Sequence, residues 1–568
     1  MFVNYIINKF ISTQVYKTKK KNRAIIVNEI ENEWIELEDQ TVLLWSEILK
    51  LNIFNSIVLS NAINKPANEI EKFLVELKNA NIIRSSENIK ENEQIKLDSQ
   101  QEKNQVSYDR YSSGNYNEPP PGGSNQEEEI EFMEWATENG FLYSASWEIT
   151  YRCNERCVHC FNPGASHVEG DKSFRKVEEV DTKKILKTID ELHSLGVFRL
   201  LITGGELFLR KDIFEIIEYI NKKRISYTFY TNGTLLDKDK IEKISRYYPN
   251  RVELSLYSAD AHAHDKITRL KNSWKKTVDA ALLFKKLKIN TSLKMVVMKD
   301  TINHVDQFTD FCDKNNLEYA LEYQMSAGVD GNAFPIKNLL PDAKDLILSG
   351  FNEKSPLYVG TLKKSRSYDA KKLEGDFVCG AGRTTMNITS EGNISPCNSL
   401  PLEYGNIKTD SIEKIWKNSS VGKKEFAKYS KEVSLNGSNS EKLSSWQGVR
   451  RGMYDVCGSF ERCNWCQKCP GMAYLETGSE LKPSTTNCRN SAARMIAYDL
   501  LKKYKNIEEV FKNIDIEKLK NKYSSELALW DPLKNIENNK EKDHQNIILN
   551  RTKPSALEQL LKKEKFIS

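Results

Sequence analysis

Between residues 143 and 326, stretches typical of β-strands alternate with stretches typical of helices, and this alternation limits the fold more than any other feature. The six expected strands, rich in β-branched and aromatic residues, cover residues 143–151, 198–203, 226–230, 251–257, 291–298 and 319–324. Helical periodicity lies between them at residues 182–194, 211–223, 238–247, 273–287 and 304–315. Such a series predicts the α/β class, a barrel or open sheet of parallel strands that binds ligands at the strands' carboxyl ends.

The rest of the chain divides by composition. Residues 1–85 predict a small winged-helix-like module, with a hairpin at residues 23–27 and 33–37 followed by helices at 41–51, 54–60 and 67–80. Residues 86–142 are polar and predict a flexible linker, apart from a short helix near 130–137. We expect a bridging segment at 327–375, a cysteine-rich domain at 376–490 and a helical and polar tail at 491–568.

Charge and hydropathy exclude several classes of function. The 84 Lys and Arg residues nearly balance the 79 Asp and Glu residues, so the net charge of +5 on 568 residues does not predict binding to nucleic acid. The apolar start of the chain is interrupted by Asn4, Asn8 and Lys9, and no run of 18 apolar residues occurs. We therefore expect a cytoplasmic protein with neither a membrane nor a nucleic acid as its partner.

The eleven cysteines point to metal rather than to disulfides, because their number is odd and no export signal precedes them. Cys153, Cys157 and Cys160 form a C-x3-C-x2-C triplet directly after the first expected strand. Three thiolates at this spacing can hold three irons of a [4Fe-4S] cluster and leave the fourth iron open. A structural zinc ion would need a fourth ligand, for which only His159 and His167 lie nearby.

The triplet resembles the signature of the radical S-adenosylmethionine (SAM) superfamily, in which it ends the first strand of a partial (β/α)6 barrel. His159 stands where that family usually has an aromatic residue. The resemblance implies that SAM is the cofactor and that a 5′-deoxyadenosyl radical takes hydrogen from the substrate. It also implies that Glu206 holds the SAM ammonium group. The other implied SAM contacts follow the second, third and fourth strands: Gly204, Gly205, Asn232, Ser255 and Tyr257.

Seven later cysteines resemble the SPASM extension of radical SAM peptide-modifying enzymes, which carries two auxiliary [4Fe-4S] clusters. By their order, Cys379, Cys397 and Cys469 would serve the first cluster, and the second would take Cys457, Cys463, Cys466 and Cys488. Seven thiolates cannot fill eight iron sites, so one auxiliary iron would stay open for a substrate thiolate. Zinc knuckles are the alternative, because the C-x2-C-x2-C spacing of residues 463–469 also suits tetrahedral zinc. Cys312 stands alone on an expected helix and fits a buried apolar position.

The first module resembles PqqD-like recognition elements, which bind the leader segment of ribosomally made precursor peptides (RiPPs). The implied mode is β-augmentation, in which the leader adds a strand to the edge at residues 33–37 and packs against the third helix. A winged helix that binds DNA is the alternative. On the third helix, however, Lys72 and Lys78 alternate with Glu71 and Glu76, a pattern that suits phosphate poorly.

Together these resemblances indicate a radical SAM/SPASM oxidoreductase that modifies a precursor peptide and takes electrons from a donor such as flavodoxin or ferredoxin. A thioether is the favoured product, and a carbon–carbon cross-link, an epimerisation or a backbone excision stays open. Two alternatives remain: an anaerobic protein maturase such as a formylglycine-forming enzyme, and a non-catalytic iron–sulfur redox regulator with a DNA-binding head. The sequence alone nominates no catalytic acid or base.

Overall fold

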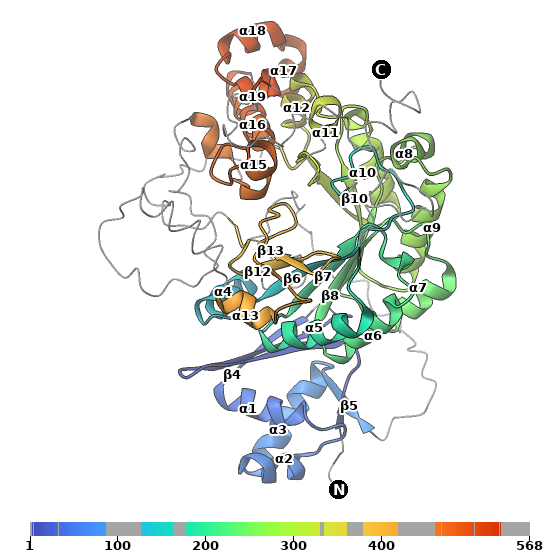
Figure 1. Ribbon diagram of the computed structural model, residues 1–568, viewed down its shortest axis with the longest axis vertical. Helices are drawn as coiled ribbons and strands as arrows, with labels where there is room; N and C mark the ends of the chain where they lie inside the picture. Colours follow the sequence, from blue (N-terminus) through green and yellow to red (C-terminus); the bar gives the residue numbers. More distant parts are fainter. Residues whose placement is uncertain are drawn as a thin grey trace, which may run out of the picture.

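The computed structural model describes residues 3, 5–31, 33–86, 126–162, 178–329, 334–359, 379–418, 460–466, 468–504, 506–532 and 534–535. The N-terminal module lies at one end of the molecule and the C-terminal helices at the other, with a large sheet between them (Figure 1). Within the described ranges, no helix is long and apolar enough to cross a membrane.

Six parallel strands form the centre of the structure, in the order β11-β10-β9-β8-β7-β6. They are β6 (Ser144–Thr150), β7 (Arg199–Gly204), β8 (Ser226–Thr231), β9 (Arg251–Ser255), β10 (Thr291–Val296) and β11 (Glu318–Glu322). Each matches an expected strand, because β-branched and aromatic residues at their buried positions suit a sheet covered on its outer face. The sheet is the partial barrel of the predicted fold class.

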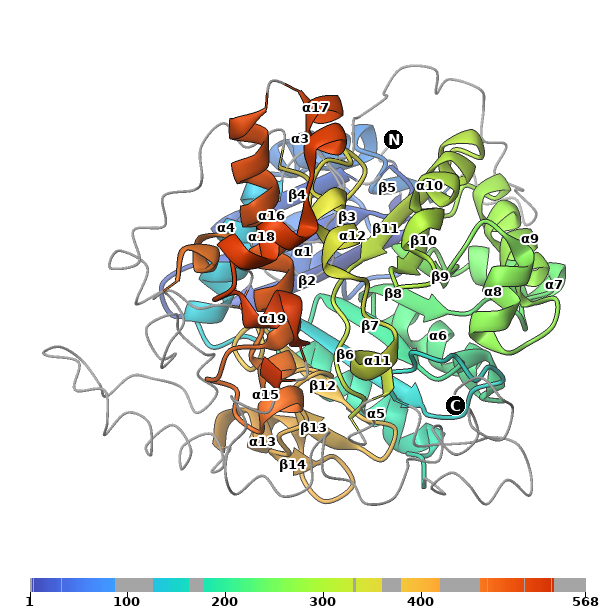
Figure 2. The same ribbon diagram turned by 90° about the horizontal axis from the view of Figure 1, so that it is seen from above.

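Helices cover the outer face of this sheet (Figure 2). The five expected ones are α5 (Thr182–Ser194), α6 (Ile213–Lys222), α7 (Lys238–Ser245), α9 (Ser273–Lys286) and α10 (Val305–Lys314). They bury an aliphatic stripe, such as Ile213, Ile216 and Ile220 of α6, against the strands. A further helix, α8 (Ala261–Thr268), escaped prediction because its sequence is mostly polar; the carboxylate of Asp260 caps it by accepting the N–H of Ala263 at 2.7 Å.

The cysteine-rich region continues the same sheet. Strand β12 (Thr385–Ile388) pairs in parallel with β6, and β13 (Asn393–Ser395) and β14 (Gly405–Asn406) follow in antiparallel pairing. Helix α13 (Ile412–Asn418) comes next, and α15 (Pro470–Thr477) and the buried α16 (Thr485–Lys503) follow in the last part. Helix α16 packs against α12 (Ala343–Ser349) and α19 (Leu527–Trp530) and runs through residue 490, the expected domain boundary. The remaining short helices are α11 (Phe334–Asn338), α17 (Ile507–Asn513) and α18 (Ile516–Lys522).

The N-terminal module has a three-stranded antiparallel sheet, β2 (Ile11–Lys17), β3 (Asn22–Asn28) and β4 (Glu33–Glu38), in that order. Helices α1 (Asp39–Ile48), α2 (Ser56–Ile63) and α3 (Ala67–Asn79) cover one face, and β1 (Tyr5–Ile7) pairs with β5 (Ile83–Ser85). The expected hairpin is β3–β4. Strand β2 was not expected, because Ser12, Thr13 and Gln14 read as polar surface residues although all three are buried.

The module packs against the amino ends of the barrel strands. The Thr13 N–H donates to the carbonyl of Arg224 at 2.8 Å, and the Tyr16 hydroxyl donates to the carbonyl of Gly196 at 2.8 Å. Arg224 lies just before β8 and Gly196 just before β7. Helix α4 (Gln126–Glu138) lies near the helix expected within the linker. Its Phe132 is buried in an aromatic contact with Tyr16 of the module and Phe198 of the barrel. The module therefore lies at the end of the barrel opposite the strands' carboxyl ends.

Candidate active site

The cysteine triplet lies in the loop that follows β6, at the carboxyl end of the barrel. Two backbone hydrogen bonds anchor this loop to α8, from Arg156 N–H to Thr268 O at 3.0 Å and from Val158 N–H to Ile267 O at 3.1 Å. Burial, and after it the charge of Glu155, raises the pKa of the Cys153 and Cys157 thiols, and the Cys160 thiol adds to both rises. Three thiols this close repel one another when ionised, so they fit a cationic iron cluster that ligates them as thiolates.

The end of β7 approaches this loop so closely that only glycine fits there. A Cβ atom on Gly204 would lie 2.1 Å from the carbonyl oxygen of Thr150, and one on Gly205 would lie 2.2 Å from that of Arg152. Gly204 also has a φ of +138°, which side chains rarely adopt. The Gly-Gly pair therefore keeps the residue before Cys153 in place.

The expected SAM-contact residues divide into two groups. His159, Gly204, Gly205, Asn232, Ser255 and Tyr257 line one cavity together with the cysteine triplet. Glu206 does not line it: its buried carboxylate accepts hydrogen bonds from Thr231 Oγ1 at 2.8 Å and from the Asn232 N–H at 2.8 Å. Its contact with SAM stays a prediction, while in the structure its hydrogen bonds hold the end of β8.

Contacts near the triplet fix the side chains of Asn232, His159 and Tyr257. The Asn232 amide donates to Asn154 Oδ1 at 3.0 Å, beside Cys153. The rings of His159 and Tyr257 meet edge to face with centroids 4.4 Å apart. Burial lowers the pKa of His159 to about 4, so its imidazole is neutral at physiological pH.

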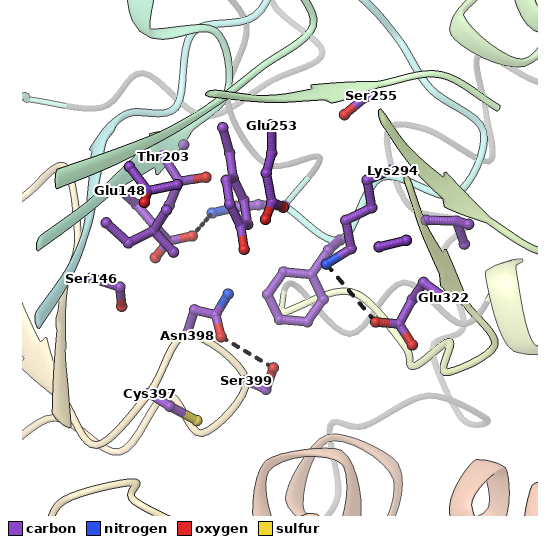
Figure 3. Close-up of a pocket in the computed structure, with 18 of the residues that line it drawn as sticks. Ser146, Glu148, Thr203, Glu253, Ser255, Lys294, Glu322, Cys397, Asn398 and Ser399 are labelled. Atoms are coloured by element: carbon purple, nitrogen blue, oxygen red, sulfur yellow. Dashed lines mark hydrogen bonds and ion pairs between the residues drawn. The ribbon is translucent and has the colours of Figure 1, made fainter. Parts of the chain in front are cut away.

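The cavity has a volume of about 870 Å³ and extends from the triplet through the inside of the barrel to the cysteine-rich region. Figure 3 shows Glu148, Glu253, Lys294 and Glu322 inside it. We did not predict these charged residues from the sequence. The alternation of side chains along each strand could have indicated them. Glu253 lies between Val252 and Leu254, which are buried against the outer helices, so its side chain faces the inside of the barrel.

Three auxiliary cysteines line the same cavity: Cys379, Cys397 and Cys469. Burial raises the pKa of Cys397, and the negative charges of Cys469 and Cys379 raise it further, so these three thiols are neighbours. They are the three assigned to the first auxiliary cluster by sequence order.

A second group forms around Cys488 at the start of α16. Burial raises the pKa of Cys488 to about 12, with further contributions from Cys466 and Cys463. Cys457, the fourth residue assigned to this cluster, lies outside the described residues. Cys312 is buried on α10, where Val305 and Phe308 are buried as well.

In the part of the chain that the structure describes, no three Cys, His, Asp or Glu side chains converge tightly enough to hold a single metal ion.

Two regions of the chain, the barrel and the cysteine-rich region, match known protein families. Residues 147–312 match the radical SAM superfamily, and residues 379–470 match the iron-sulfur cluster-binding domain called SPASM. The chain has a radical SAM fold followed by a SPASM domain. The radical SAM region contains the triplet and strands β7–β10, and the SPASM region contains Cys379, Cys397 and Cys469. These domains support SAM and iron–sulfur clusters as the cofactors.

Relatives of the chain are similar at low identity. The AdoMet-dependent heme synthase of Methanosarcina barkeri is 24% identical over 59% of this chain and 93% of that protein. The subtilosin biosynthesis protein AlbA of Bacillus subtilis is 27% identical over 49% of this chain and 60% of AlbA. Among solved structures, SuiB of Streptococcus suis with S-adenosylmethionine is 16% identical, with a TM-score of 0.45, and covers 84% of this chain and 98% of SuiB.

Proposed function

We propose that this chain is a radical SAM enzyme that modifies a ribosomally made precursor peptide, with a thioether as the favoured product. The observation that carries the proposal is the single cavity that the SAM-cluster cysteines share with Cys379, Cys397 and Cys469. A peptide residue inside the barrel can therefore meet both groups at once. The relatives named above include a heme synthase as well as a bacteriocin biosynthesis protein, so the choice of a peptide as substrate rests on this chain's own N-terminal module.

The cofactors that we propose are SAM and three [4Fe-4S] clusters, one at the triplet and two in the SPASM domain. When bound, the first cluster and SAM supply the one-electron chemistry that removes a hydrogen atom from the substrate. The chain's own residues shape the SAM site. The rings of His159 and Tyr257 pack together and line the cavity beside the triplet, and Gly205 allows the end of β7 to lie against the triplet loop. The barrel strands that line the cavity would enclose the peptide residue and exclude water from it.

The N-terminal module supports a leader-binding role, because its sheet has one edge available. The β2 edge already meets the barrel through the Thr13 N–H, whereas β4 pairs only with β3 among the described strands. One face of the sheet packs on α1 and α3, and the other packs Tyr16, Val27 and Trp34 against α4 and the barrel. A leader strand would therefore add at β4.

This placement sets a minimum distance between leader and core. The module sits at the amino ends of the barrel strands, and the triplet sits at the carboxyl ends. A six-residue strand such as β7 spans about 20 Å at ~3.3 Å per residue. The peptide must pass along the outside of the barrel before it enters, so we expect the modified residue to lie at least about six residues beyond the leader strand, at ~3.3 Å each.

Hydrogen–deuterium exchange tests the leader site without disturbing the module. Deleting residues 1–85 would be a poor experiment, because it would expose Phe132 and Phe198 of the aromatic contact. We expect a leader peptide, synthesised from any short open reading frame that flanks the gene, to slow exchange of the β4 amides. Helix α18 at the far end serves as the internal control. A peptide that binds tightly and leaves β4 exchange unchanged would contradict the site.

Anaerobic co-expression tests the proposed function. Each peptide encoded by a flanking open reading frame is co-expressed with the enzyme, and its mass is measured by mass spectrometry. A thioether requires the loss of two hydrogen atoms, so we expect one peptide about 2 Da lighter, with loss of a free thiol. Alkylation of that thiol distinguishes a thioether from a carbon–carbon cross-link, which leaves the thiol free. If every flanking peptide keeps its mass and its stereochemistry, the proposal fails.

A further inference from the structure

Four glutamates on the barrel strands line the cavity, and three of them have partners. Glu318 on β11 forms an ion pair with Arg251 at 2.9 Å. Glu148 on β6 accepts hydrogen bonds from three donors, namely Tyr151 Oη at 3.2 Å, Asn162 Nδ2 at 3.3 Å and Asn387 Nδ2 at 3.1 Å. Glu322 on β11 accepts the Gln324 N–H at 2.8 Å and faces the ammonium group of Lys294 at 4.0 Å. Each of these carboxylates would have to give up an existing contact to accept a proton.

Glu253 on β9 differs from these three. It lines the cavity, and its carboxylate has no hydrogen bond or ion pair with any residue that the structure describes. It lies two residues before Ser255, so both side chains are on the inner face, about 7 Å apart along the strand. Figure 3 shows it directed into the space near Lys294. Among the strand glutamates that line this cavity, Glu253 is therefore the one that can accept a proton at no cost in protein contacts.

We propose that Glu253 is the general base that takes the proton from the thiol of a cysteine in the core peptide. The proposal rests on the proposed function, since a thioether forms only after that thiol has lost its proton. The S–H bond breaks, its electron pair stays on sulfur, and the proton forms an O–H bond with the Glu253 carboxylate. The proton then passes to solvent when the product leaves.

Lys294 explains how a carboxylate can act on a thiol, which is the weaker acid by about four pKa units. The transfer requires stabilisation of the thiolate as it forms. The Lys294 ammonium lies 5.5 Å from the centroid of the Tyr230 ring and shares its charge with Glu322, so it is held inside the barrel. A positive charge beside the sulfur favours the ionised form. Glu253 and Lys294 therefore form a base and a counter-charge on neighbouring strands.

A Glu253→Gln variant tests this role, because the amide keeps the size of the side chain and cannot accept a proton at neutral pH. The probe is the flanking peptide that the wild-type enzyme modifies. We expect cross-linking to slow by about 100-fold or more, the usual contribution of a general base. Glu253→Asp should recover part of the rate. Glu134→Gln is the matched control, because this carboxylate is exposed on α4.

A selenocysteine in place of the reacting peptide cysteine separates proton transfer from a structural role. A selenol is already ionised at neutral pH and needs no base, so it should restore cross-linking by Glu253→Gln. Wild-type rates in Glu253→Gln with the cysteine peptide, or no recovery with selenocysteine, would overturn the assignment. The wild-type enzyme is assayed first. If it modifies none of the peptides, the proposed function is wrong, and this result is distinct from a failure of the Glu253 assignment.

Discussion

A Cys157→Ala variant is expected to lose the cluster at the triplet and all cleavage of SAM. Cys157 is the central ligand of a three-cysteine site, and the two thiols that remain cannot hold three irons. The loop itself should persist, because Val158 and Arg156 bond to α8 through their backbone. After anaerobic reconstitution, iron content should fall by about four atoms per chain, and 5′-deoxyadenosine should be absent.

Cys312→Ala is the matched control for this variant. Cys312 is buried on α10, outside both groups of auxiliary cysteines, so its loss should leave iron content unchanged and cost only a small packing defect. Full iron loading or continued SAM cleavage in Cys157→Ala would show that the triplet is not the SAM-binding site.

Gly205→Ala is expected to destabilise the same cluster without removing a ligand. The new Cβ would lie 2.2 Å from the Arg152 carbonyl oxygen and 2.8 Å from that of Tyr151, so backbone must move. Arg152 immediately precedes Cys153, and its carbonyl also accepts the Glu206 N–H at 2.8 Å. Overpacking of this kind costs about 1–3 kcal/mol or more. Iron retention after gel filtration and the urea midpoint should both decrease.

Gly140→Ala provides the comparison. Gly140 has a positive φ of +83°, and a Cβ there would meet nothing within 4 Å. It should lose about 1 kcal/mol from backbone strain alone and keep its iron. If the two variants retain iron equally, the close approach of β7 to the triplet loop does not support the cluster.

The elements that the sequence predicted are those whose own residues carry the pattern. Helix α5 spans the residues expected from its aliphatic spacing, because that stripe faces the sheet. Strand β2 was missed, since the donors of the buried Thr13 and Gln14 side chains find their acceptors outside the strand: Thr13 Oγ1 donates to Ile25 O at 2.6 Å and Gln14 Nε2 to His193 O at 3.0 Å. The parallel pairing of β12 with β6 joins segments about 240 residues apart and left no local signal.

The candidate site shows the same division. The triplet is a local motif, so its spacing alone predicted it. The grouping of Cys397 with Cys379 and Cys469 follows the assigned order, but only the folded chain places all three beside the triplet. Glu253 and Lys294 could not be chosen from sequence, because many strands carry an inward polar residue. Their roles depend on which cavity residues already have partners.

The central claim is that this chain cleaves SAM reductively at the triplet. The most direct measurement is 5′-deoxyadenosine formed by the full-length protein, reconstituted anaerobically with iron and sulfide and supplied with SAM and dithionite. We predict 5′-deoxyadenosine and methionine in equal amounts from the wild type and neither from Cys157→Ala. A fully iron-loaded wild-type protein that forms no 5′-deoxyadenosine, with or without the flanking peptides, would contradict the claim.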